Sequence, residues 1–211
     1  MSAVSGRVTV LAGSTFSVKG PADVRHDGAL ATVEAGSSRV EVMVPLGAQV
    51  AIGTTSGRVQ ARGELGDTAV TTVSGRVSVE HAASVDVRAG SGRVEVGSVD
   101  GMCRVRAEHG RVSVQQAGAA DLSTESGRIE VGSVSGPVRA HSVSGRVTVE
   151  LSQAADVDAE TISGRVEVRL PPDVVAAIDR GDGAPTTTEP ADCHVRATSV
   201  SGRVDVVHSG R

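Results

Sequence analysis

Residues 72–79 read Thr-Val-Ser-Gly-Arg-Val-Ser-Val, and this stretch decides the fold because close copies of it recur throughout the chain. The shared core is Ser-Gly-Arg-Val, with small variations such as the isoleucine at 129 or the histidine at 109. Self-similarity of this kind is typical of repeat architectures. The glycine position of each copy is occupied by Gly6, Ser38, Gly57, Gly75, Gly92, Gly110, Gly127, Gly145, Gly164 and Gly202.

The spacing of these copies is nearly constant. From Ser38 to Gly164 the successive steps are 19, 18, 17, 18, 17, 18 and 19 residues. The step from Gly164 to Gly202 is 38 residues, twice 19, which predicts a degenerate extra copy near Gly183. The step from Gly6 to Ser38 is 32 residues, which predicts an enlarged, irregular N-terminal coil over 11–37 that covers the open end.

Within one period the apolar residues lie two apart, which is the spacing of strands. Val77 and Val79 follow one glycine, and Val85, Val87 and Ala89 precede the next. A glycine in every copy disfavours helix by about 1 kcal/mol each. Two short strands per 17–19 residues with no helix between them predict an all-β fold, a parallel β-solenoid (β-helix). We expect it to be right-handed, by analogy with parallel crossovers.

The composition fits a thin core within one domain spanning 1–211. Hydrophobic residues make up 39% of the 211-residue chain, and Phe16 is its one aromatic residue, so valine and alanine must fill the interior. A net charge of −4 and the scarcity of aromatic side chains argue against a nucleic-acid module, which would need stacking platforms. After Leu170, we expect a strand over 174–178 and a mobile loop over 179–192.

The sequence contains no motif that indicates catalysis, metal binding or export. Cys103 lies in an inward column and Cys193 several coils away, so neither a disulfide nor a zinc spacing is expected. The six histidines are scattered, and no nucleophile is paired with a base. We therefore expect no enzyme activity, metal or cofactor. The chain shows neither a signal peptide nor a membrane-spanning run, so a cytoplasmic location is expected.

The most regular polar feature is the arginine after each glycine. Because it stands between inward-facing positions, it must point outward and form a ladder along one edge. One interpretation is a solvated face, offset by Glu95, Glu130, Glu167 and Asp205 in the next outward column. The other is a linear site for an anionic polymer or phosphorylated surface. The candidate binding residues are Arg58, Arg76, Arg93, Arg111, Arg128, Arg146, Arg165 and Arg203, with Arg7 and Arg39 in the same column.

The repeated Ser-Gly-x-Val-x-Val units, with the Gly-Ser-Val-x-Gly connectors at 97–101 and 132–136, resemble the bacterial β-strand-repeat family that carries an adhesin label, domain of unknown function 4097. The resemblance covers nearly the whole chain. It implies a β-solenoid and supplies no catalytic residues. Many members have aspartate where this chain has arginine after glycine.

Together these features predict a non-catalytic repeat protein with a rigid binding surface, whose partner is an extended anionic polymer or another protein. The alternative is a cytosolic structural scaffold that self-associates end to end through its open coils.

Overall fold

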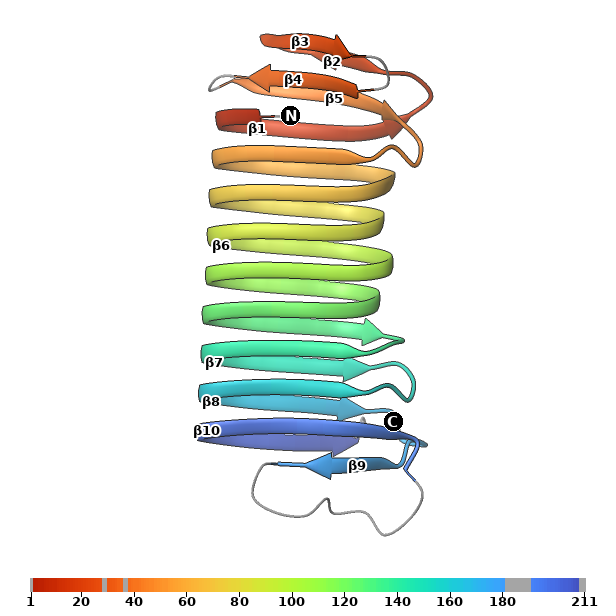
Figure 1. Ribbon diagram of the computed structural model, residues 1–211, viewed down its shortest axis with the longest axis vertical. Coiled ribbons are helices and arrows are strands. Elements are labelled where there is room, and N and C mark those ends of the chain that lie inside the picture. The colour runs from red at the N-terminus through yellow and green to blue at the C-terminus, as the bar shows by residue number, and fades with distance from the viewer. Residues whose placement is uncertain (1, 28–29, 36–37, 181–190, 209–211) are drawn as a thin grey trace.

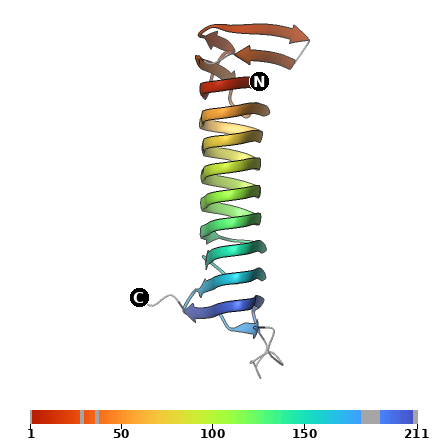
Figure 2. The ribbon, with the colours of Figure 1, turned by 90° about the vertical axis from the view of Figure 1, so that its left-hand side faces the viewer.

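The computed structural model describes residues 2–27, 30–35, 38–180 and 191–208, and these form one tall stack of β-coils (Figure 1). Viewed from a perpendicular direction, the coils lie one above another along the long axis (Figure 2). The all-β prediction is confirmed. The strands are β1 (Ser2–Gly13), β2 (Ser17–Lys19), β3 (Ala22–Asp27), β4 (Leu30–Ala35), β5 (Arg39–Pro45), β6 (Val50–Val134), β7 (Val138–Leu151), β8 (Val157–Leu170), β9 (Ala176–Asp179) and β10 (Cys193–His208).

Neighbouring coils pair in parallel and in register. Gly127 of β6 pairs with Gly145 of β7, which pairs with Gly164 of β8. Strand β6 is continuous because its chain passes through several coils without losing the ladder pairing. Equivalent positions of the repeat therefore stack on one another, about 4.8 Å apart from one coil to the next.

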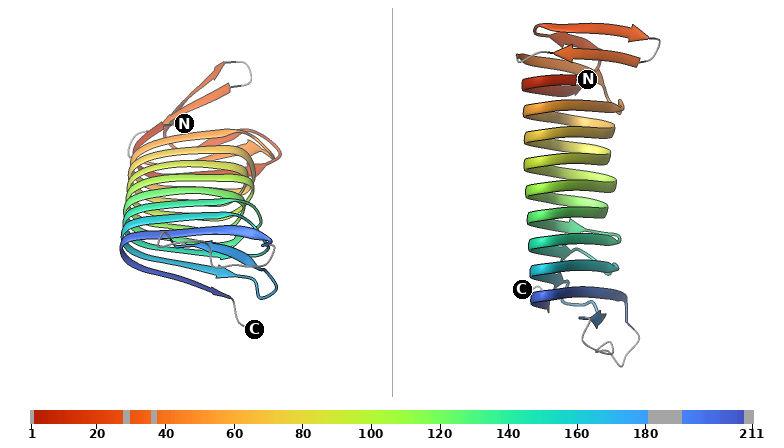
Figure 3. Two further views of the ribbon diagram at one scale, coloured as in Figure 1. Left: turned by 60° about the horizontal axis from the view of Figure 1, so that its bottom comes forward. Right: turned by 60° about the vertical axis from the view of Figure 1, so that its left-hand side comes forward.

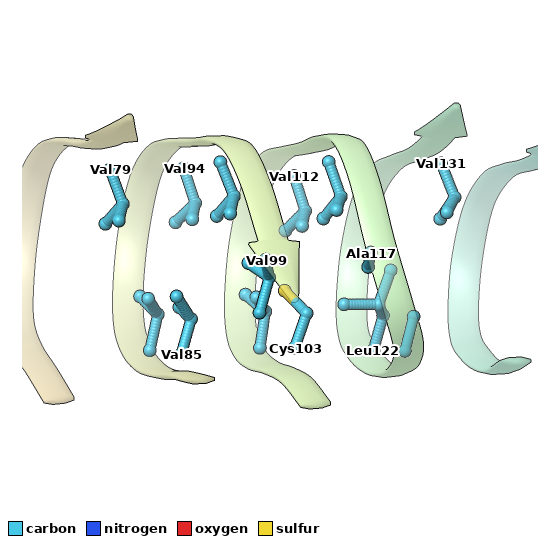
Figure 4. Packing of buried hydrophobic residues seen from close by; sticks show 14 of the residues in the cluster. Val79, Val85, Val94, Val99, Cys103, Val112, Ala117, Leu122 and Val131 are labelled. Atoms are coloured by element: carbon cyan, nitrogen blue, oxygen red, sulfur yellow. The ribbon is translucent and has the colours of Figure 1, made fainter. Parts of the chain in front are cut away.

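The valine columns meet in a dry interior, as predicted. Val79 and Val94 line one wall, and Val85 faces them from the other (Figure 4). A further inward column, which the sequence reasoning missed, fills the far corner between the two walls. It comprises Leu65, Ala82, Val99, Ala117 and Val134, all buried.

The small column three residues before each glycine contains buried hydroxyls. Thr54 and Thr72 donate theirs to the carbonyl oxygens of Ser56 and Ser74. Ser142 and Thr161, which pair with one another across adjacent coils, have no hydrogen-bond partner for their hydroxyls among the described residues. Only part of the column therefore satisfies its buried hydroxyls.

The glycine ladder exists because adjacent coils touch backbone to backbone at the corner. Gly110 has φ +131°, and a Cβ on it would fall on the carbonyl oxygen of Gly92, far inside van der Waals contact. A side chain at this position would force the coils apart, and L-residues rarely adopt this φ.

The N-terminal coils are stacked in an order that the sequence reasoning did not predict. β1 pairs with β5 on one side and β6 on the other, so Gly57 stacks on Gly6 and not on Ser38. The step of 19 residues from Ser38 to Gly57 thus does not join neighbouring coils. From the segment 11–37, β2 pairs antiparallel with β5, and β3 pairs antiparallel with β4 to form a hairpin that extends beyond the stack (Figure 3).

This order explains why Ser38 can replace glycine. A Cβ on each interior ladder glycine points at the ladder carbonyl of the coil nearer the N-terminal end. Ser38 leads into β5, the outermost parallel strand at that end, and the pairing of β2 with β5 reaches Glu41 only. Within the described residues, no further ladder glycine lies beyond Ser38 for its Cβ to meet.

The coil predicted near Gly183 does not lie between the coils of Gly164 and Gly202 in the stack. Gly202 of β10 pairs directly with Gly164 of β8, so no coil lies between them. β9, close to the strand expected over 174–178, pairs with 193–196 on the outer side of β10. Most of the loop expected over 179–192, together with Gly183 itself, lies outside the described residues.

Across the parts of the chain that the structure describes, no helix has the length and apolar character needed to span a membrane.

Candidate binding surface

The arginine ladder runs along the corner where every coil passes through its glycine. Arg7 pairs with both Arg39 and Arg58, and Arg165 pairs with both Arg146 and Arg203. The prediction that these side chains point outward is confirmed, since each ladder arginine with a described side chain is partly or fully exposed while the valine or isoleucine after it is buried in the core or packs against it.

A groove follows this ladder over its full length, with a volume of about 1600 Å³. Its floor is the bare backbone of the ladder glycines, and its remaining lining is arginine, with Ser38 at one end. The groove brings all ten ladder arginines together: Arg7, Arg39, Arg58, Arg76, Arg93, Arg111, Arg128, Arg146, Arg165 and Arg203.

Stacking like charges in register costs free energy. Two unit charges at the coil spacing of about 4.8 Å repel by up to about 0.9 kcal/mol in water. The Debye length at physiological salt is about 8 Å, so nearest neighbours are only partly screened from one another. An array of this kind attracts counter-ions, and a polymer that carries many anions relieves several repulsions at once.

Only part of the ladder is neutralised from within the chain. The Arg93 guanidinium lies 3.6 Å from the Glu95 carboxylate, and that of Arg128 lies 3.4 Å from Glu130. Across the described ranges, no other ladder arginine forms an ion pair. Glu167, which we expected to offset the ladder, binds Arg169 instead at 2.7 Å.

The outward face of the other strand has a different charge pattern, which the sequence reasoning missed. Six residues before each ladder glycine from Gly92 to Gly202, acidic and basic side chains alternate from coil to coil. Arg104 lies 3.3 Å from Asp121, and Arg139 stands between Asp121 and Asp158 in register. Opposite charges placed across strands stabilise a sheet. The signal was present in the sequence as the column Asp86, Arg104, Asp121, Arg139, Asp158 and Arg196.

A second, smaller hollow of about 530 Å³ lies beside this alternating face. Arg88 and Arg106 line it together with Glu108, Glu125 and His141. Because both signs of charge line this hollow, it offers an anion no uniform attraction. The long groove is therefore the stronger candidate for an anionic ligand.

The cysteines and histidines do not gather into a site. Cys103 and Cys193 are both buried and free, and burial raises the pKa of the Cys103 thiol to about 12. Burial also raises the pKa of the Cys193 thiol. His141 lies 3.7 Å from Glu160 on the alternating face. Among the residues that the structure describes, no group of three or more His, Cys, Asp or Glu could hold a metal ion.

The family model Toastrack DUF4097 matches residues 8–207, nearly the whole chain. Neither the curated proteins nor the solved structures yield a match.

Proposed function

Since the chain belongs to the Toastrack DUF4097 family, whose function is unknown, we propose from the geometry of its groove that it is a non-catalytic module that binds a linear anionic polymer along the arginine ladder. The observation that carries the proposal is the contrast between the two outward faces. One strand alternates acid and base from coil to coil, whereas the ladder repeats arginine in every coil.

The lining of the groove supports binding over catalysis. It holds no carboxylate and no imidazole, and its one hydroxyl side chain is that of Ser38 at the end. Guanidinium groups match the paired oxygens of phosphate and carboxylate, so either kind of anionic polymer fits the chemistry. Nucleobases would find no aromatic side chain in the groove on which to stack.

The structure gives less support to a head-to-tail scaffold. The short antiparallel strand β2 pairs with residues 41–43 of β5, so this part of the N-terminal end does not present the parallel edge that an identical coil would extend. Short and antiparallel end strands are a common protection against edge-to-edge association. We therefore do not propose polymerisation through both ends.

The test measures binding of labelled inorganic polyphosphate by fluorescence anisotropy across a range of salt concentrations. A triple variant, Arg111→Gln, Arg146→Gln and Arg165→Gln, removes three ladder charges. Counterion release is worth about 0.7 log units of affinity per contact for each tenfold change in salt, so the loss at about 50 mM salt is roughly 500-fold. The salt slope should fall by about 2.

A matched control removes the same charge from the alternating face, through Arg104→Gln, Arg139→Gln and Arg196→Gln. This variant should keep nearly the wild-type affinity and slope. Equal losses in the two triple variants, or no binding by the wild type, would overturn the proposal. A parallel titration with polygalacturonate shows whether carboxylate polymers bind as phosphate polymers do.

A further inference from the structure

The structure assigns Arg169 as a positioning residue that keeps the C-terminal part of the ladder free to bind anions, although Arg169 does not line the groove. This inference rests on the proposed function and deepens it. It concerns which glutamates compete with the polymer for the ladder guanidinium groups.

The competition follows from strand geometry. In each coil, the outward residues one, three and five places after the glycine share a face, so a carboxylate at the third place lies between the first and the fifth. An arginine at the fifth place can therefore draw the carboxylate away from the ladder arginine at the first.

Two coils carry glutamate at the third place and glycine at the fifth. Glu95 and Glu130 are followed two residues later by Gly97 and Gly132, and each glutamate pairs with the ladder arginine on its other side. The two glycines cannot easily be replaced, because a Cβ on either would meet the backbone of the preceding coil. Arg93 and Arg128 are therefore partly neutralised in the resting protein.

The coil of Gly164 has the opposite arrangement. Arg169 stands at the fifth place, and its Nε and Nη2 atoms lie 2.9 and 2.7 Å from Oε1 of Glu167. Its Nη1 atom also lies 4.0 Å from Glu150 in the adjacent coil. By holding Glu167, Arg169 leaves Arg165 without an ion-pair partner among the described residues, and Arg146, whose coil has Thr148 at the third place, also lacks one. With Arg203 they form three consecutive unneutralised steps at this end of the groove.

The first test replaces Arg169 by glutamine and measures polyphosphate binding. Releasing Glu167 toward Arg165 should cost one anion contact, which is about eightfold in affinity at about 50 mM salt and about 0.7 in the salt slope. The double variant Arg169→Gln with Glu167→Gln should return to within about twofold of the wild type, although it still lacks Arg169. The single variant Arg139→Gln removes the same charge from the alternating face and should change affinity by less than about twofold.

The second test has the opposite sign. The double variant Glu95→Gln and Glu130→Gln frees two ladder arginines, so polyphosphate should bind about 60-fold more tightly at about 50 mM salt, with a slope steeper by about 1.4. The variant Glu167→Gln alone, whose carboxylate is held by Arg169, should gain less than about twofold. A gain of about eightfold, equal per glutamate to that of the double variant, would show that general charge, and not pairing, controls affinity.

A ligand-free measurement separates this inference from the proposed function. Arginine guanidinium N–H signals in NMR spectra, from Nη as well as Nε, report which guanidinium groups hold a carboxylate. In the wild type we expect slow solvent exchange at Arg93 and Arg128, which contact their glutamates through Nη1, and in Arg169→Gln the Arg165 signal should acquire the same slow exchange. An unchanged Arg165 signal, or a failure of Glu167→Gln to rescue binding, would overturn the role of Arg169. Absence of polyphosphate binding with the NMR shift present would overturn the proposed function alone.

Discussion

Replacing Gly110 by alanine should destabilise the protein far more than a comparable substitution at Gly47. Both glycines have positive φ, +131° and +69°. A Cβ on Gly47 meets nothing within 4 Å, whereas a Cβ on Gly110 falls on the Gly92 carbonyl oxygen. The pair therefore separates the cost of stacking from the cost of the backbone conformation.

The magnitudes follow from the two environments. Alanine at Gly47 should lower the free energy of unfolding by about 1 kcal/mol, the cost of the left-handed conformation alone. At Gly110 the backbone conformation, which is accessible almost only to glycine, should cost about 2 kcal/mol. The Gly110→Ala variant also loses about two inter-coil hydrogen bonds as the coils separate, each worth about 1 kcal/mol. The expected losses are thus about 1 and about 4 kcal/mol.

Urea denaturation followed by circular dichroism measures both losses, provided that the denaturant slope stays equal among the variants. For a chain of this length, thermal midpoints should fall by about 3 °C for Gly47→Ala and by about 12 °C for Gly110→Ala. Equal losses in the two variants would refute the claim that the backbone contact between coils is what requires glycine.

Three further outcomes test the core, a buried thiol and the stacking order. Leu122→Ala should cost about 3 kcal/mol of unfolding free energy because the side chain is fully buried, whereas Leu46→Ala at an exposed site should cost almost none; equal urea midpoints would contradict this. Burial raises the pKa of the Cys103 thiol from 9.0 to about 12, so the folded protein keeps this thiol protonated at a pH where the unfolded chain ionises it. The free energy of unfolding should therefore fall between pH 9 and 12, by about 1.4 kcal/mol at pH 10. A Cys103→Ala variant should lack that part of the pH dependence. Ser163→Cys with Ser201→Cys should form a disulfide, because these residues pair in adjacent strands, and should add at most about 4 kcal/mol; failure to cross-link would contradict the direct contact of β8 and β10.

The interior of the fold could be predicted from the sequence because each structural requirement leaves a residue in every coil. Val77 and Val79 mark the inward face, and Gly75 marks the corner where backbones touch. The stacking order at the two ends could not be predicted from the spacing, because Gly57 can pair equally well with any coil of the same pattern. One signal was available: Ser38, the one ladder position without glycine, belongs to the outermost parallel coil. The handedness stays a prediction.

The candidate surface was predictable in position but not in its internal pairing. An arginine between an inward glycine and an inward valine must point outward, so the ladder followed from alternation alone. The partner of Glu167 did not, since Arg165 and Arg169 are each two residues away from it. Only the side-chain geometry shows that Arg169 holds this carboxylate.

Neither the first described strand nor the start of the last lies at the outside of the stack. Much of β1 is held between β5 and β6, whereas β10 is flanked by β9 only over residues 193–196 and pairs with β8 alone beyond them. Fraying of β1 therefore has to break hydrogen bonds on two flanks at once, while fraying of the later part of β10 breaks them on one. An exopeptidase working inward from residue 2 would meet a doubly anchored strand at once, whereas one working inward from residue 208 would reach such a strand only at residue 196.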